Sequence, residues 1–268
     1  MPYIQVNNAN LYYEEHGSGP ETIVFAHGLM WSGLLYEYQV AALKGHYRCI
    51  TFDFRGQGKS RITQNGYDMD SLTGDAAAII EKLQAAPCHF AGLSMGGFVG
   101  MRLAIRYPHL LKSLILLETS ADPEPAEKIN LYRLMALVTR LVGTRVAANK
   151  VMPIMFGEKF LNDPGRAELR EKLKQRAISN NKKGIYRATK GVINRDSVCD
   201  QLEKINIPTL IIVGDQDAAT PPSKSERMHQ RIVDSEMVVI PGAGHTSTVE
   251  EPEAVNKAII DFLEGDQS

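Results

Sequence analysis

The chain has 268 residues, of which 44% are hydrophobic and 23% charged, and its formal net charge at pH 7 is −1. This size and composition are typical of one large α/β domain or of a core domain with an inserted segment. The near-zero charge argues against a nucleic-acid-binding protein, which would show a basic surface, and favours a small-molecule ligand.

The N-terminus and the cysteines favour a cytoplasmic protein. Residues 1–8 lack the basic start and apolar run of a signal peptide, and no stretch approaches the ~20 apolar residues that span a bilayer. The chain has three widely spaced cysteines, an odd number without a metal-ligand pattern: Cys49, Cys88 and Cys199. We expect reduced cysteines and neither membrane nor metal partners, whereas the oligomeric state stays open.

The first residues favour strands. Residues 3–6 and 11–15 alternate and are rich in tyrosine, and the asparagine-rich segment 7–10 between them predicts a hairpin turn. Residues 22–26 form a short, continuous apolar run. Such a run is typical of a strand that is buried on both faces of a parallel sheet.

A small turn containing His27 and Gly28 follows this apolar run. A turn of this kind can place a backbone N–H beside a nucleophile, and we expect Leu29 to supply that N–H to an oxyanion. We interpret the His27 side chain as structural, with its ring bonded to the local backbone. Met30 and Trp31, the next residues, are candidates for the substrate pocket.

Strand and helix patterns then alternate along the chain. Apolar runs predict buried strands at residues 48–52, 88–91, 113–117, 209–213 and 237–240. Helical spacing predicts helices at residues 76–83, 95–107, 223–232 and 253–263. This alternation predicts an α/β fold, in which a mostly parallel sheet carries helices on both faces and the crossovers are right-handed.

Residues 92–96 contain the pattern G-x-S-x-G between a predicted strand and a predicted helix. A serine on such a sharp turn has a strained backbone, and the flanking glycines remove side chains that would collide there. The helix behind Ser94 directs its first amide groups at the site. We therefore predict Ser94 as the nucleophile and the N–H of Met95 as a second oxyanion donor.

The alternation stops between residues 122 and 197. This stretch has helical patterns but no convincing strand, so it predicts a helical cap at 122–197, inserted into a core domain of residues 1–121 and 198–268. We expect the cap to roof the substrate pocket. Its candidate pocket residues are Met135, Met152, Met155 and Phe156.

His245 is the candidate general base. It follows the last predicted strand on a glycine-flanked loop, at the carboxyl end where open α/β sheets keep their sites. Histidine titrates in the range needed to take the proton of a serine hydroxyl. Of the seven histidines, only His245 combines this loop with a position downstream of Ser94.

The histidine needs a buried carboxylate that fixes its tautomer. Asp215 and Asp217 follow the predicted strand at 209–213, and Glu118 follows an earlier strand. The chain order serine, aspartate, histidine is the order of G-x-S-x-G hydrolases and favours Asp217. Asp215 and Glu118 stay open as candidates for the acid.

Five segments together resemble the α/β-hydrolase superfamily, and they are residues 27–28, 53–60, 92–97, 214–217 and 242–245. Within it, the sequence is similar to the capped branch of small esterases, lactonases, enol-lactonases and cofactor-free haloperoxidases, and also to acyl-homoserine lactonases. The resemblance implies an eight-stranded sheet, a cap after strand six, and Asp217 as the acid. It also implies that residues 53–60 are a structural turn, with Arg55 tied to nearby loops.

The expected activity is cleavage of small-molecule esters or lactones with an apolar acyl chain, N-acyl homoserine lactones among them, through an acyl-enzyme and without a metal or organic cofactor. An enol-lactonase or a cofactor-free haloperoxidase (perhydrolase) is one alternative, and a slow-turnover lactone receptor is another. Because the motif loops carry no cluster of arginine or lysine, we expect neutral substrates to be preferred over carboxylate-bearing ones.

Overall fold

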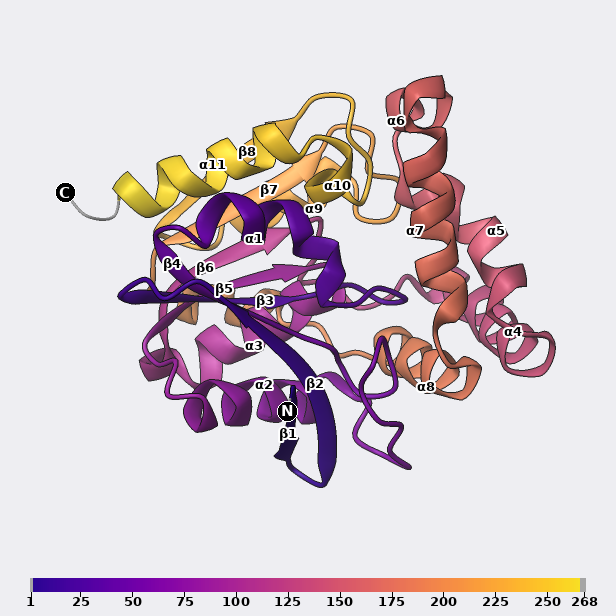
Figure 1. Ribbon diagram of the computed structural model, residues 1–268, viewed down its shortest axis with the longest axis horizontal. Coiled ribbons are helices and arrows are strands. Elements are labelled where there is room, and N and C mark those ends of the chain that lie inside the picture. Colours follow the sequence, from indigo (N-terminus) through magenta and orange to yellow (C-terminus); the bar gives the residue numbers. More distant parts are fainter. Residues whose placement is uncertain (1, 266–268) are drawn as a thin grey trace.

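The structure is a computed structural model and describes residues 2–265. Eight strands form one sheet in the order β1-β2-β4-β3-β5-β6-β7-β8 (Figure 1). They are β1 (Tyr3–Val6), β2 (Ala9–His16), β3 (Glu21–Ala26), β4 (Tyr47–Phe52), β5 (Cys88–Leu93), β6 (Leu111–Leu117), β7 (Thr209–Gly214) and β8 (Ser235–Ile240). β1 and β2 are antiparallel to their neighbours, and the remaining pairs are parallel. The predicted sheet is confirmed.

The hairpin turn between β1 and β2 is tighter than the sequence pattern predicts. Val6 pairs directly with Ala9, so only Asn7 and Asn8 form the turn. Both have positive φ angles, 44° and 60°. Asparagine tolerates this left-handed region better than most residues, which explains the two-residue connection.

Helices cover both faces of the sheet. They are α1 (Glu37–Leu43), α2 (Met69–Lys82), α3 (Met95–Arg106), α9 (Pro222–His229), α10 (Ser247–Glu250) and α11 (Pro252–Gly265). Residues of α2, α3 and α9 belong to one buried apolar cluster, and residues of α1 and α11 belong to a second. This double cover explains why β5 and β7 are buried along their whole length.

Between β6 and β7 the chain forms helices only, within the described residues. They are α4 (Ala126–Val142), α5 (Thr144–Met155), α6 (Glu158–Asn162), α7 (Ala167–Ser179) and α8 (Lys182–Ile193). We call residues 122–197 the helical insertion, and Figure 1 shows it standing to one side of the sheet. Its treatment as a cap separate from the core domain stays a prediction. No helix in the described part of the chain has both the length and the apolar character needed to cross a membrane.

Candidate active site

Ser94 lies on a strained turn between β5 and α3. Its φ and ψ angles are 52° and −109°, a conformation that costs on the order of 1–3 kcal/mol in a non-glycine residue. A Cβ atom on Gly92 would lie 2.3 Å from the carbonyl oxygen of Gly96, and one on Gly96 would lie 2.0 Å from that of Ala26. Only glycine fits at either position, so the G-x-S-x-G spacing is a packing requirement of the turn.

The backbone of this turn is held from the neighbouring strand. The N–H of Ser94 donates to the carbonyl of Leu117 at 2.9 Å, and the hydroxyl of Thr119 donates to the carbonyl of Ser94 at 2.8 Å. These bonds fix the main chain, and the Ser94 side chain lies on the wall of a cavity.

His245 and Asp217 form a buried pair. Nδ1 of His245 lies 2.8 Å from Oδ2 of Asp217, so it carries the proton and leaves Nε2 as the basic nitrogen. The other oxygen, Oδ1, accepts bonds from the N–H groups of Ala219 and Thr220. Although burial raises the pKa of Asp217, the His245 ring and these bonds lower it below the ordinary value. Asp217 therefore stays ionised and orients the ring.

The two alternative acids lie elsewhere. Asp215 is exposed, and its carboxylate accepts a bond from the N–H of Gly242 at 2.7 Å, which fixes the loop after β8. Glu118 is fully buried, and burial raises the pKa of its carboxyl well above the ordinary value, with the charges of Asp217 and Glu250 adding to the effect. These effects favour the neutral form of Glu118, which does not suit a carboxylate that orients a histidine.

Glu250, which the sequence did not single out, ties the loop of His245 to the helical insertion. Its carboxylate accepts bonds from the N–H of Gly157 at 2.7 Å, of Gly244 at 3.0 Å and of Thr246 at 3.1 Å. Burial raises the pKa of Glu250 to about 7, although these donors and the nearby His245 lower it. This carboxyl group thus changes charge near neutral pH at a point that positions His245.

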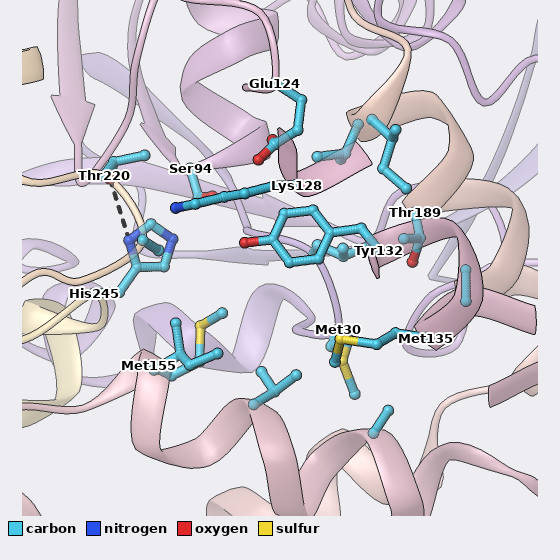
Figure 2. Close-up of a pocket in the computed structure, with 18 of the residues that line it drawn as sticks. Met30, Ser94, Glu124, Lys128, Tyr132, Met135, Met155, Thr189, Thr220 and His245 are labelled. Atoms are coloured by element: carbon cyan, nitrogen blue, oxygen red, sulfur yellow. Dashed lines mark hydrogen bonds between the residues drawn. The ribbon is translucent and has the colours of Figure 1, made fainter. Parts of the chain in front are cut away.

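Ser94 and His245 open on one cavity of about 280 Å³ beneath the helical insertion (Figure 2). Most of its lining is apolar. The predicted pocket residues Met30, Met135 and Met155 line it, as does Leu29. Other contributions from the insertion are Ala136, Thr139, Val151, Ile185 and Val192.

The other three predicted pocket residues do not line this cavity. Trp31 and Phe156 are nearly buried in the apolar cluster on the α1 side of the sheet, where their rings meet edge to face at 6.2 Å. Met152 packs against the same cluster. The φ of Met30 is 69°, and the two neighbours pack in different apolar clusters, Met30 with Ala147 and Ile185 and Trp31 on the α1 side of the sheet. The prediction that Trp31, Met152 and Phe156 line the pocket is wrong.

The sequence analysis did not identify Lys128 and Tyr132, two of the polar side chains of α4 that line the cavity. Figure 2 shows the ammonium group of Lys128 and the hydroxyl of Tyr132 pointing toward the side where Ser94 and His245 lie. Burial raises the pKa of Tyr132, so its hydroxyl remains a hydrogen-bond donor at neutral pH. Lys128 is exposed at the rim, and no carboxylate of the described residues forms an ion pair with it. Helical spacing gave no sign that these two side chains face inward.

The predicted oxyanion donors, Leu29 and Met95, belong to the two turns that meet at Ser94. A Cβ atom on Gly28 would lie 3.4 Å from that of Ser94, so the turn carrying Leu29 packs directly against Ser94. The N–H of Met95 is the first of α3 and has no acceptor within its own helix. Both amides are therefore candidates to bind an oxyanion beside Ser94.

The remaining motif residues hold loops in place. His27 is buried, accepts a bond from the N–H of Phe54 at 3.0 Å, and has its other nitrogen 2.6 Å from the carbonyl of Gly28. Arg55 forms a buried ion pair with Asp75. The structural interpretation of His27 and Arg55 is confirmed. Among residues 2–265, no group of three or more histidine, cysteine or acidic side chains is placed to hold a metal ion.

A G-x-S-x-G elbow, an aspartate–histidine pair and a mostly parallel eight-stranded sheet define the alpha/beta hydrolase fold. The chain belongs to this family, whose model matches residues 21–252. The predicted α/β-hydrolase fold is thereby confirmed.

Within this family, the chain is similar to enol-lactonases and to an esterase. The chain is 30% identical over 237 residues to 3-oxoadipate enol-lactonase 2 of Acinetobacter baylyi, covering 88% of this chain and 86% of the relative. It is similar to a thermophilic esterase from Thermogutta terrifontis, with a TM-score of 0.92 and 30% identity, over 100% of this chain and 98% of the other. It also resembles the enol-lactonase from Burkholderia xenovorans LB400, with a TM-score of 0.92 and 28% identity, over 98% and 100%. The predicted resemblance to esterases and enol-lactonases is confirmed.

Proposed function

We propose that the protein is a serine hydrolase that cleaves esters or lactones with an apolar acyl chain through an acyl-enzyme on Ser94. One observation carries this proposal. Ser94 and the His245–Asp217 pair meet at a cavity whose other walls are mostly apolar. Reactive groups at one end of an apolar cavity suit a substrate with a carbonyl at one end and a hydrocarbon chain beyond it.

Acylation begins with the Ser94 hydroxyl. Nε2 of His245 takes its proton as the oxygen attacks the substrate carbonyl, and the ring becomes positively charged. The ionised Asp217, 2.8 Å from Nδ1, stabilises that charge. The N–H groups of Leu29 and Met95 bind the developing oxyanion.

Collapse of the tetrahedral intermediate breaks the bond to the leaving alcohol, which receives the proton from His245. A lactone leaves its alcohol attached to the acyl chain, so ring opening gives a single product. Water then attacks the acyl-enzyme with His245 again acting as the base, which releases the acid and restores Ser94.

The cavity lining supports acyl chains over rigid rings. Met30, Met135 and Met155 contribute flexible side chains that adapt to the shape of a hydrocarbon. N-acyl homoserine lactones combine such a chain with a lactone carbonyl, so they belong to the proposed substrate class.

A chain-length series tests this proposal. We expect kcat/KM for p-nitrophenyl esters and acyl homoserine lactones to rise up to about four-fold per methylene until the cavity is full, since each buried methylene contributes about 0.8 kcal/mol. Flat chain-length dependence without lactone turnover would contradict the proposed substrate class.

A second candidate is hydrolysis of a carboxylate-bearing enol-lactone. Lys128 supports it, because an exposed ammonium group without an ion-pair partner in the described structure lies at the rim of the cavity. The absence of basic residues from the motif loops therefore does not decide the charge of the substrate, since the helical insertion supplies Lys128 and Arg195, of which Arg195 is paired with Glu124.

Lys128→Ala separates the two candidates. If Lys128 binds a substrate carboxylate, the substitution should raise KM for anionic substrates about ten-fold and leave neutral esters unchanged. Lys44→Ala removes an exposed lysine outside the cavity and is the matched control. Equal effects of Lys128→Ala on charged and neutral substrates would argue for the first candidate.

Perhydrolysis and lactone sensing are distinguished from hydrolysis by separate assays. A perhydrolase with an intact Ser94 would halogenate a test substrate only when peroxide is added. A lactone receptor would show one stoichiometric burst of product and then almost no turnover. Sustained turnover of esters without peroxide supports the hydrolase.

A further inference from the structure

The helix α4 carries an apolar stripe on its outer side. Leu131, Leu134, Leu137 and Leu141 recur at intervals of three and four residues, so they lie along one side of the helix. Their exposed fractions are between 43% and 67%. A row of four exposed leucines is unusual for a surface helix, which places its apolar side against the core.

The stripe continues over the turn into α5. Val142 is 69% exposed and Val146 is 37% exposed. Nothing lies within 4 Å of a Cβ atom placed on Gly143, so the turn between them is also open. We call Leu131, Leu134, Leu137, Leu141, Val142 and Val146 the outer face. Figure 1 shows α4 and α5 at the edge of the insertion, away from the sheet.

Basic residues surround the outer face. Residues 126–155 contain five basic side chains, Lys128, Arg133, Arg140, Arg145 and Lys150, against one acidic side chain, Glu127. Lys128 lines the cavity, so the other four are the basic residues that surround the outer face. All five are exposed. No ion pair in the described part of the chain involves any of the five. Lys182, from α8, donates to the carbonyl of Leu141 and adds another exposed charge at the end of the stripe.

The inner sides of the same two helices line the catalytic cavity. Met135 and Thr139 reach it from α4, and Val151 and Met155 reach it from α5. Ile154 lines the cavity and is still 36% exposed, so it connects the cavity rim to the surface. A partner surface bound to the outer face would therefore lie next to the cavity.

We propose that the outer face docks on an anionic lipid surface. Leucine and valine side chains enter the boundary between headgroups and acyl chains, while the surrounding lysine and arginine side chains pair with anionic headgroups. A second copy of this chain fits less well. In a symmetric contact through this face, the basic residues of the two copies would face each other. Each copy would supply only one acidic residue to offset their repulsion. This inference does not depend on the proposed hydrolase activity.

Vesicle sedimentation with the full chain tests the docking. We expect binding to vesicles of equal phosphatidylglycerol and phosphatidylcholine at low salt, weak binding to phosphatidylcholine alone, and loss of binding as salt screens the charges. The double variant Leu134→Glu/Leu141→Glu should weaken partitioning at least about 25-fold, since each unit of charge near the surface changes it about five-fold. Arg140→Gln/Arg145→Gln should weaken it by a similar factor.

Val233→Glu is the matched control, because Val233 is an 85% exposed apolar residue outside the insertion. It should change partitioning less than about five-fold. All substituted positions are exposed, so the thermal midpoints should match that of the unsubstituted protein.

Two results would overturn the proposal. One is the absence of binding to anionic vesicles, or equal binding by the Leu134→Glu/Leu141→Glu variant. The other is a concentration-dependent dimer in sedimentation velocity that the same variant dissociates, since the outer face would then be an interface between two copies. Ester turnover in solution is measured separately, so failure of docking and failure of the hydrolase proposal are distinguishable.

Discussion

The loops at the carboxyl ends of the strands and the helical insertion are built in different ways. Asp217 and His245 are each only 3% exposed, and backbone bonds fix their loops. α4, by contrast, exposes four leucines and carries Lys128 at a rim. The proposed chemistry therefore rests on buried turns, whereas the proposed choice of substrate rests on a helical segment that packs less completely.

Hydrogen bonds join the two regions close to the site. Glu250 bonds Gly157 of the insertion, and the amide of Asn180 donates to the carbonyl of Met30 at 2.8 Å. The side-chain oxygen of Asn180 also accepts from the N–H of Gly58 at 2.9 Å. Substitutions in the buried turns should therefore act mainly on kcat, and substitutions at the junctions should also act on KM.

The largest expected effect is that of Ser94→Ala. Loss of the nucleophile should lower kcat for an ester by about 10⁵–10⁶ and leave the fold intact. Steady-state kinetics and circular dichroism measure both. Retention of more than one-hundredth of the activity would show that the buried turns do not carry the chemistry.

Asp217→Asn should lower kcat on the order of 10⁴, because His245 would be held in the wrong tautomer. Asp215→Asn is the matched control on the same loop and should cost far less, since the Asp215 carboxylate bonds the N–H of Gly242 and not His245. Similar losses at both positions would mean that loop geometry, and not one carboxylate, orients the histidine.

Glu250→Gln tests the first junction. A glutamine has one acceptor oxygen where the carboxylate serves three N–H groups, so the loop of His245 should shift and kcat should fall about 10²-fold. Unchanged kcat would contradict a positioning role for this residue.

The pH dependence of stability gives an independent readout of Glu250. Its pKa is raised from the ordinary value of 4.5 to about 7 in the folded chain, so the folded state binds the proton more tightly than the unfolded state. Below about pH 4.5, protonated Glu250 makes its full contribution to the free energy of unfolding. About 3 kcal/mol of that free energy is lost as the pH rises through about 7. Unfolding curves of the unsubstituted protein should show this loss, and those of Glu250→Gln should not.

Asn180→Ala should have the smallest effect on catalysis. It leaves the carbonyl of Met30 without its buried donor, which costs about 1–3 kcal/mol of stability. KM should rise a few-fold because Met30 lines the cavity, while kcat changes little. Chemical unfolding and steady-state kinetics measure the two effects. A kcat loss as large as that of Glu250→Gln would contradict the expectation that this junction acts mainly on KM.

Much of the sheet and the proposed triad could be predicted from the sequence, because both follow local rules. Gly92 and Gly96 are required by contacts within the same turn, and apolar runs mark strands covered on both faces. Asp217 and His245 each follow a strand end, and the carboxyl ends of parallel strands meet at one edge.

The errors and omissions fall where distant segments meet. Trp31 packs against Phe156 of the insertion, and the backbone of the preceding Met30 is bonded by Asn180 of the same segment. The inward side of α4, which brings Lys128 to the cavity, is set by packing against α8. Glu250 is one acidic residue among several near the C-terminus until the fold places Gly157 beside it. No local pattern encodes such contacts.

Covalent labelling tests most directly whether Ser94 is the nucleophile of an acyl-enzyme, as we propose. A phosphonate ester probe should inactivate the protein with a stoichiometry of one, and mass spectrometry should place the adduct on Ser94. Asp217→Asn should slow the labelling, since an activated hydroxyl is required. An adduct on another serine with Ser94 unmodified, or no adduct under conditions of full ester turnover, would contradict the account.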